Sequence, residues 1–306
     1  MSEFIAANKL LNRVKVGTSG WSYDDWIGPF YKSDEKSKWL DYYANFFSTV
    51  EINSTYYRIP GENVVNVWIE KSKKYDAFAY SMKFPRFYDI SIGKELIDQF
   101  ENEVIFPIYE NGVLGAILIQ LTPYVRRVEK GVRTGNLERL DEFFGMLDTD
   151  SYNYFVEFRH ASWLERDRQS IEHETMHVLE KHNVGSCIVD GPPFPTLLPN
   201  EGTRSDIIYV RLHGRNYEEW FKKHGSEDTL PMSARYDYEY TKDEIASWSE
   251  KIRKIETEFD SKRIWIYFNN HPLGKAPRNA LMLMNLLGIT GGGGDVAPFD
   301  QRRPLY

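Results

Sequence analysis

The stretch YFVEFRH, residues 154–160, has the pattern of one strand of a parallel sheet. It has the apolar content of a buried strand, yet it includes Glu157, Arg159 and His160. Because residues two apart in a strand share a face, Val156 and a phenylalanine at 158 point one way while Glu157 and Arg159 point the other. A strand that is apolar toward covering helices and charged at its C-terminal end is expected where parallel strands meet a polar site.

Seven more segments of this kind run along the chain, separated by helical patterns. The other expected strands are VKVGTSGW from Val14, TVEINSTYY from Thr49, AFAYSMKF from Ala77, VLGAILIQL from Val113, VGSCIVD from Val184, IIYVRLHG from Ile207 and RIWIYFNNH from Arg263. The helical patterns lie near residues 37–47, 63–74, 94–109, 136–147, 169–182, 241–258 and 276–287. Such alternation predicts an α/β protein with a parallel sheet.

The simplest closure of eight such strands is a single (β/α)₈ barrel of the TIM type. The sequence has no composition break, so we expect one domain over residues 1–290 and a Gly-rich C-terminal tail over 291–306. The sixth unit differs, because GPPFPTLLPNEGTRSD (191–206) is rich in proline and has no helical period. This segment predicts an irregular loop in place of a helix.

Composition excludes several classes of protein. A net charge of −7 disfavours broad non-specific binding of nucleic acid but leaves room for a local basic site. Cys187 is the only cysteine, which rules out a disulfide framework and a thiolate cluster for zinc. The sequence has no signal-peptide pattern and no apolar run of the roughly 18 residues that a membrane span needs. We therefore expect a cytoplasmic protein with no membrane partner, and the sequence indicates no protein partner.

Polar residues occur at the C-terminal end of every predicted strand. In chain order they are Ser19, Trp21, Glu51, Asn53, Lys83, Gln120, Glu157, Arg159, His160, Asp190, Arg211, His213, Arg215, Asn269, Asn270 and His271. Active sites of TIM-type barrels lie at this end of the strands. Buried charges there must pair with one another or bind a polar ligand.

These segments also carry a family resemblance. In GTSGWSYDDW, FFSTVEINSTYYRIP, VEFRHASW, YVRLHGR, YDYEY and YFNNHPLGKAPRNA, in this order, the chain resembles the YecE-like proteins, the domain of unknown function 72 family. The resemblance covers nearly the whole chain. It implies a TIM-type barrel and no established reaction.

Three interpretations of the polar strand ends stay open. One is a structural ion-pair network without a ligand. A second is a metal site, because Glu51, Glu157, Asp190 and three histidines supply suitable ligand atoms. Lys83 and the nearby arginines crowd the same region, so a divalent metal is not favoured and the cofactor stays undetermined. HETMH (173–177) matches a zinc-protease pattern, but its helix is expected on the outer surface, which favours a solvated face.

The third interpretation, anion binding, is the one we favour. Guanidinium and ammonium groups bind phosphate, and aromatic side chains stack on rings. We expect an enzyme that acts on a phosphate-bearing or nucleic-acid-like substrate by phosphoester hydrolysis. A non-catalytic nucleic-acid or anion-binding protein and a metal-assisted sugar isomerase are the alternatives.

This hypothesis assigns a role to each residue. The expected catalytic residues are Glu157, His213 and Lys83, with Glu157 or His213 as the general base. The expected substrate-binding residues are Trp21, Glu51, Asn53, Tyr57, Arg159, His160, Asp190, Arg211, Arg215, Asn269, Asn270 and His271. No metal ligand is assigned.

Overall fold

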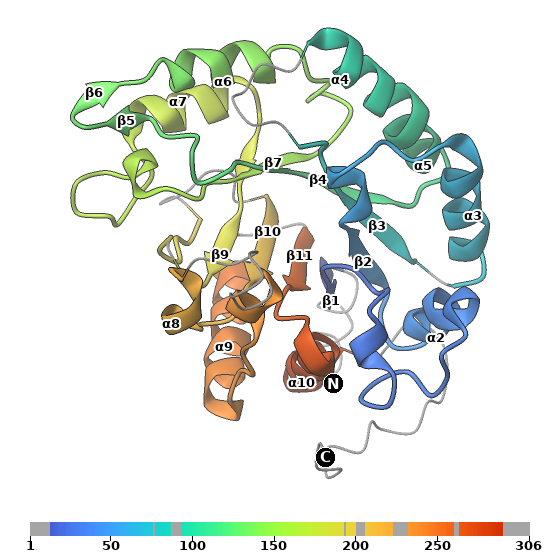
Figure 1. Ribbon diagram of the computed structural model, residues 1–306. Coiled ribbons are helices and arrows are strands. Elements are labelled where there is room, and N and C mark those ends of the chain that lie inside the picture. The colour runs from blue at the N-terminus through green and yellow to red at the C-terminus, as the bar shows by residue number, and fades with distance from the viewer. Residues whose placement is uncertain are drawn as a thin grey trace.

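The strands of the computed structural model form two parallel sheets and one short hairpin (Figure 1). The structure describes residues 13–75, 77–86, 93–192, 194–199, 206–222, 232–259 and 263–289. The first sheet has the order β1-β11-β10-β9, and the second has the order β2-β3-β4-β7-β8. The strands are β1 (Val14–Thr18), β2 (Thr49–Ile52), β3 (Ala79–Lys83), β4 (Leu114–Gln120), β7 (Tyr154–Glu157), β8 (Gly185–Ser186), β9 (Ile188–Asp190), β10 (Ile207–Leu212) and β11 (Arg263–Phe268).

Each expected strand is present, and the sixth one is divided in two. Cys187 separates β8 from β9, and its backbone N–H donates to the Val156 carbonyl of β7 at 2.8 Å. The strands are buried on both faces, as parallel strands under covering helices are. The predicted α/β class with parallel strands is therefore confirmed.

The two sheets also contact each other on the side of β1 and β2. Ser19 and Glu51 form an isolated parallel bridge, and the Gly20 N–H donates to the Glu51 carbonyl at 2.8 Å. Between the sheets, Tyr267 of β11 hydrogen-bonds through its hydroxyl to Thr49 of β2 and Ser81 of β3, both at 2.7 Å. Side chains of the first sheet thus reach those of the second.

Two hydrophobic clusters pack against these sheets. The larger one lies between strands and helices, with residues such as Val50, Ile117 and Trp248. The smaller one consists of Ala79, Ala116, Leu118, Phe155, Cys187, Val189, Tyr209, Trp265 and Tyr267. Its members alternate along the strands with those of the larger cluster, as residues on opposite strand faces must.

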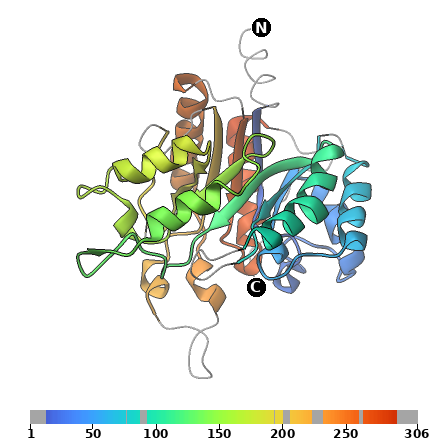
Figure 2. The ribbon, with the colours of Figure 1, turned by 90° about the horizontal axis from the view of Figure 1, so that it is seen from above.

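The helices surround the strands (Figures 1 and 2). They are α2 (Trp39–Ala44), α3 (Glu62–Ser72), α4 (Lys94–Phe100), α5 (Phe106–Glu110), α6 (Asn136–Phe144), α7 (His173–Lys181), α8 (Tyr217–Trp220), α9 (Lys242–Glu258) and α10 (Lys275–Leu287). A π-helical turn, η4 (Glu101–Ile105), joins α4 to α5 within the helix expected near 94–109. The expected capping box is confirmed: Thr241 and Glu244 bond each other's backbone N–H at the start of α9.

Short 3₁₀ turns follow several strands and position the loops at their C-terminal ends. They are η1 (Asp24–Trp26), η2 (Lys36–Lys38), η3 (Ser54–Tyr56), η5 (Ala161–Trp163), η6 (Met232–Tyr236) and η7 (Pro272–Gly274). The antiparallel hairpin of β5 (Val128–Glu129) and β6 (Val132–Arg133) was not expected from the sequence.

Two sequence predictions fall partly or wholly outside the described residues. The described part of the loop after strand six, residues 191–192 and 194–199, contains no helix, as expected. The Gly-rich tail over 291–306 lies outside the described residues, and so does the proposed boundary at 290.

Candidate functional site

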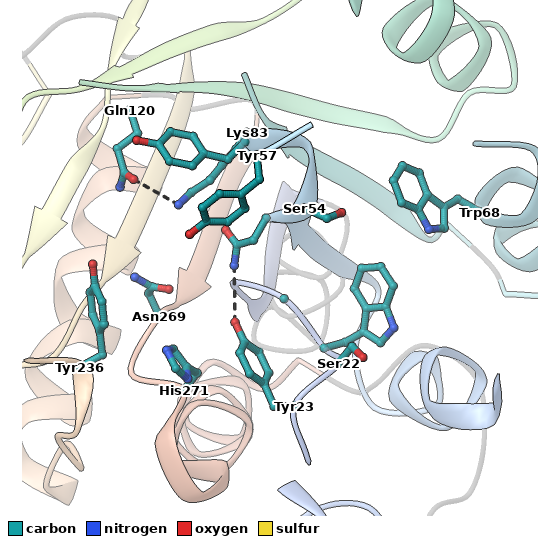
Figure 3. Close-up of a pocket in the computed structure, with 14 residues that line it drawn as sticks. Ser22, Tyr23, Ser54, Tyr57, Trp68, Lys83, Gln120, Tyr236, Asn269 and His271 are labelled. Atoms are coloured by element: carbon teal, nitrogen blue, oxygen red, sulfur yellow. Dashed lines mark hydrogen bonds between the residues drawn. The ribbon is translucent and has the colours of Figure 1, made fainter. Parts of the chain in front are cut away.

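A pocket of about 500 Å³ lies where the strands β1, β2, β3, β4 and β11 end (Figure 3). Its lining residues are Gly20, Trp21, Ser22, Tyr23, Asn53, Ser54, Tyr56, Tyr57, Trp68, Lys83, Gln120, Tyr236, Asn269 and His271. Most of them are the last residue of a strand or belong to the loop that follows it. The volume is within the range of small-molecule sites.

Arg211 of β10 is the centre of a buried network next to this pocket. Its Nη1 donates to Glu157 Oε2, and its Nη2 donates to Glu51 Oε1 at 2.8 Å. Nη2 also contacts Ser19 Oγ at 3.1 Å, and Ser19 Oγ donates to Glu51 Oε1. Tyr209 donates its hydroxyl to Glu51 Oε2 at 2.6 Å. All five side chains are buried, so each charge is balanced by a direct partner.

Glu157 accepts hydrogen bonds on both of its carboxylate oxygens. Besides Arg211 on Oε2, Oε1 accepts from Gln120 Nε2 at 2.8 Å and contacts His213 Nε2 at 3.2 Å. Burial alone would raise the pKa of Glu157, but the positive charge of Arg211 and the bond from His213 outweigh it and hold the pKa well below its ordinary value. Glu157 is thus a fixed anion with its lone pairs occupied.

His213 bridges Glu157 and Asn269. Asn269 Nδ2 lies 2.9 Å from His213 Nδ1, so Nδ1 accepts and the ring proton is assigned to Nε2, which donates to Glu157. Burial is the main cause that lowers the pKa of His213 to about 4. The ring is neutral around pH 7, and both nitrogens are used within the network.

Lys83, the last residue of β3, brings an amine into the pocket. Its Nζ donates to Gln120 Oε1 at 3.2 Å and lies 5.1 Å from the centre of the Tyr56 ring. Figure 3 shows the Lys83 amine directed toward Gln120. Burial, followed by the charge of Arg211, lowers the pKa of Lys83 to about 7. The amine and the ammonium forms are therefore both populated near neutral pH.

Gln120 links the Lys83 amine to the buried network through hydrogen bonds. Its oxygen accepts from Lys83 while its amide nitrogen donates to Glu157, so the side-chain amide connects the two. Because Lys83 is a donor and the Glu157 carboxylate an acceptor, only one orientation of the amide satisfies both neighbours.

Aromatic rings form much of the pocket wall. Tyr23 stacks on His271 with ring centres 4.6 Å apart and planes inclined by 10°. Asn53 Nδ2 donates to the Tyr23 hydroxyl at 3.5 Å. Burial lowers the pKa of His271 to about 4, so this ring is neutral as well. Tyr57 is 77% exposed at the edge of the pocket, where its ring is free to contact a ligand.

The structure divides the residues that were expected to form the site into three groups. Those that line the pocket are Trp21, Asn53, Tyr57, Lys83, Asn269 and His271. Those in the adjoining buried network are Glu51, Glu157, Arg159, Arg211 and His213. Those whose side chains neither line the pocket nor bond to the side chains of this network are His160, Asp190, Arg215 and Asn270. Arg159 lies at the margin of the network, with Nε 3.7 Å from Glu157 Oε1 and its guanidinium 5.4 Å from the centre of the Trp220 ring.

Asp190 and Arg215 pair with each other instead of facing the pocket. Arg215 donates to both carboxylate oxygens of Asp190, at 2.8 and 2.7 Å, and to Glu244 of α9 at 2.8 Å. Trp248 of α9 also donates to Asp190. These contacts attach the end of β9 to α9, so we assign both residues a structural role.

His160 and Asn270 are likewise occupied by the backbone around them. His160 Nδ1 accepts from the Ser162 N–H at 3.1 Å and caps η5. Asn270 Nδ2 donates to the Tyr238 carbonyl and to Asn279 Oδ1, both at 2.9 Å. Neither side chain lines the pocket.

The sequence hypothesis omitted several residues that line the pocket. Gln120 ends β4, and its place at a strand end was the signal that it belongs to the site. Tyr236 comes from η6, in a segment without a strand or helix pattern, and it is the first residue of the family motif YDYEY, which was the signal that could have found it. Its ring lies 5.9 Å from both His213 and His271.

Two further motif predictions concern metal ligands and membrane spans. Within the described ranges, no group of three or more His, Cys, Asp or Glu residues is arranged to hold a metal ion. His173 and His177 of the HETMH motif are exposed on α7, which agrees with the solvated-face interpretation. Among the described helices, none has the length and apolarity of a membrane span.

Comparisons with known proteins agree with the motif resemblance. The family described as "Protein of unknown function DUF72" matches residues 15–302. UPF0759 protein YunF of Bacillus subtilis (strain 168) is 23% identical over 289 residues, which are 90% of this chain and 95% of YunF. UPF0759 protein YecE of Escherichia coli O157:H7 is 24% identical over 187 residues, which are 61% of this chain and 62% of YecE.

A solved structure of similar fold comes from the same family. The crystal structure of a DUF72 family protein from Thermotoga maritima MSB8 has a TM-score of 0.70 and 29% sequence identity, and the match covers 90% of this chain and 99% of that one. The resemblance inferred from the sequence motifs is thereby confirmed.

Proposed function

The chain belongs to the DUF72 family, and we propose that its pocket is the active site of an enzyme that acts on a small phosphate-bearing organic molecule. Phosphoester hydrolysis is the proposed reaction class. One observation carries this proposal: the buried Lys83 amine lies in the pocket wall and is bonded to the neutral amide of Gln120.

The charges around the pocket favour an anionic ligand. The carboxylates of Glu51 and Glu157 are balanced by the guanidiniums of Arg159 and Arg211, and the neighbouring His213 is neutral. Within the described part of this cluster, a protonated Lys83 then adds one uncompensated positive charge. A bound phosphate group would balance this charge and form charge-assisted hydrogen bonds with the ammonium.

The pocket walls support a substrate with a ring or a planar body. Trp21, Tyr57 and the stacked pair of Tyr23 and His271 offer aromatic faces, which stack on bases and sugars. Asn53 and Asn269 add amide groups for polar recognition. A phosphorylated sugar or a mononucleotide has both required parts.

Lys83 is better suited to proton transfer than the two groups first considered. Glu157 and His213 are both saturated by partners and do not line the pocket. An ammonium with a pKa of about 7 is matched to neutral conditions as a general acid. In the proposed hydrolysis, the P–O bond to the attacking water forms as the P–O bond to the leaving oxygen breaks, and Lys83 donates its proton to that oxygen. The proton that the attacking water brings to the released phosphate then returns to Lys83.

Binding of AMP, measured by calorimetry at pH 6.5, tests this proposal. Replacement of Lys83 by Met should weaken AMP binding at least about tenfold, because a charge-assisted hydrogen bond contributes roughly 1.5–3 kcal/mol. The control is Lys94→Met, which removes an exposed lysine of α4 that pairs with Asp98. Equal AMP affinity in wild type and K83M, or no AMP binding at all, contradicts the proposal.

A binding protein without turnover is the second candidate. The observation that favours it is that the hydrogen-bonding atoms of Glu157 and His213 are occupied by partners. Of the three expected catalytic residues, Lys83 is then the one that remains for proton transfer, and neither of the other two is free to assist it. Release of p-nitrophenol from p-nitrophenyl phosphate separates the two candidates. If the wild type binds AMP but shows no p-nitrophenol release that is lost in K83M, the binding protein is favoured.

For the fold, we propose that the two sheets close into a single (β/α)₈ barrel. The Ser19–Glu51 bridge on one side and the continuity through Cys187 on the other support closure. The smaller hydrophobic cluster would then be the barrel interior, with Arg211 and its partners above it.

A further inference from the structure

We propose that the Lys83 amine forms a covalent imine with a small aldehyde or ketone that carries one anionic group. This inference rests on the proposed active site in the same pocket and names a second chemistry for it. It concerns the unprotonated form of Lys83, whereas the phosphate contact concerns the ammonium.

The position of Lys83 gives the amine access and a fixed geometry. Lys83 is the last residue of β3 and pairs with Leu118 in the ladder between β3 and β4. The side chain is only 8% exposed, yet it belongs to the wall of a pocket of about 500 Å³. A strand end holds a reacting group more rigidly than a loop does.

The partners of Lys83 leave the nitrogen free to react. No carboxylate of the described residues lies within ion-pair distance of its Nζ, and the hydrogen bond at 3.2 Å goes to the neutral Gln120. By contrast, Lys71, Lys94 and Lys181 hold carboxylates at 2.7–2.8 Å. At Lys94 the hydrogen bond to Asp98 raises the pKa, which disfavours the unprotonated amine that attacks a carbonyl group.

Two features known to activate a lysine nucleophile coincide here. One is removal from water, and the other is a neighbouring cation. Lys83 is buried, and Arg211 acts on the same amine, which together bring its pKa to about 7. The neutral amine is therefore a large fraction of Lys83 at pH 7.5.

The chemistry balances without any further reactant. The nitrogen lone pair attacks the carbonyl carbon while the C=O electrons move to oxygen, and a proton passes from nitrogen to that oxygen to give a carbinolamine. A proton from solvent protonates the hydroxyl, and loss of water then gives the protonated imine, so the proton that the ammonium lost to solvent is regained. One C–N double bond replaces one C–O double bond, and one water is released.

The charge of the product identifies the substrate class. A protonated imine restores the single positive charge that the ammonium of Lys83 had. Since Glu51 and Glu157 are already balanced by Arg159 and Arg211, one anionic group on the bound carbonyl compound balances the imine. A keto or aldehyde acid and a sugar phosphate in its open form both satisfy this requirement.

Reductive trapping tests the inference. Full-length protein is incubated at pH 7.5 with sodium cyanoborohydride and one of three probes: glyoxylate, glyceraldehyde 3-phosphate or uncharged glyceraldehyde. Peptide mapping by mass spectrometry then measures the adduct at each lysine. We expect at least one of the two anionic probes to modify Lys83 about tenfold faster than it modifies the exposed Lys94. Uncharged glyceraldehyde should modify Lys83 more slowly than that probe does.

The controls separate this inference from the proposed function. Mapping of the wild type localises the adduct even if K83M does not fold, and Lys94→Met should leave the Lys83 adduct unchanged. No adduct at Lys83 above that at Lys94, or equal labelling by uncharged glyceraldehyde, overturns the inference. Trapping of glyoxylate without any AMP binding supports the imine and contradicts the phosphate proposal, whereas AMP binding without trapping does the reverse.

Discussion

At the scale of single residues, neighbouring strand ends differ sharply in what their side chains can do. The two terminal nitrogens of Arg211 are bonded to Glu157 and Glu51, so its charge is balanced by partners within the protein. Removal of one partner from such a group leaves a buried charge, which typically costs 3–5 kcal/mol. Lys83 has no such partner among the described residues, and it is the side chain on which both proposals rest.

His213 predicts how stability depends on pH. Its pKa is about 4 in the folded protein and about 6.5 when unfolded, so the unfolded chain binds a proton first as the pH falls. The contribution of neutral His213 to the free energy of unfolding is fully present above pH 6.5 and is lost between about pH 6.5 and 4. The total loss is on the order of 3 kcal/mol. Urea unfolding at a series of pH values measures it.

Substitution isolates this residue from the other titrating groups. His213→Gln keeps a donor toward Glu157 and an acceptor toward Asn269 but does not titrate, so its unfolding free energy should fall less steeply over this pH range. His177→Gln, at an exposed site on α7, is the matched control. An unchanged slope in H213Q would show that His213 is not held neutral by the fold.

At the scale of elements, α9 is defined by its first turn and by its contacts with the strands. Thr241 and Glu244 satisfy backbone N–H groups at its start, and Trp248 binds the carboxylate of Asp190 at the end of β9. The helix therefore both starts at a sequence signal and holds the C-terminal end of a strand in place. Sequence alone predicted the first property and not the second.

The N-terminal cap of α9 allows the effect of a substitution on stability to be predicted. Thr241→Ala removes the side-chain acceptor for the Glu244 N–H and should lower the unfolding free energy by about 1 kcal/mol. Thr257→Ala, on the exposed last turns of the same helix, should have a smaller effect. Urea denaturation of the two variants measures the difference, and equal losses would contradict a specific role of the cap.

At the scale of the whole molecule, closure of the sheets predicts a single cooperative unit. The amides of Gly20 and Cys187, which donate to Glu51 and Val156 at 2.8 Å, lie at the two junctions between the sheets. In a closed barrel these amides should exchange hydrogen with nearly the same free energy as Ile266 in the centre of the first sheet.

Native-state hydrogen exchange at increasing urea measures this. The amide of Leu273 is the control for local opening, because it donates to an exposed Asp25 carboxylate at 2.7 Å. If Gly20 or Cys187 exchanges at the low free energy of Leu273 while Ile266 stays protected, the two sheets open separately and the proposed closure is wrong.

Local patterns in the sequence were enough to predict the succession of strands and helices and the end of the strands at which polar groups gather. Alternation along a strand is local, so Glu157 could be separated from Val156 and Phe158 without knowing any partner. The same logic placed Lys83 and Asn269 at strand ends, and both line the pocket. Local capping chemistry at Thr241 was equally visible.

The pairing of these polar groups with one another follows from the three-dimensional packing. Ion pairing depends on distances between strands that are far apart in the sequence, as between Arg211 and Glu51 or between Arg215 and Asp190. Burial, which moves the pKa of Lys83 to about 7, likewise arises from surrounding elements rather than from the residue itself. Strand periodicity can place a charge on one face, but its partner and its exposure to water are fixed by the packing of the whole chain.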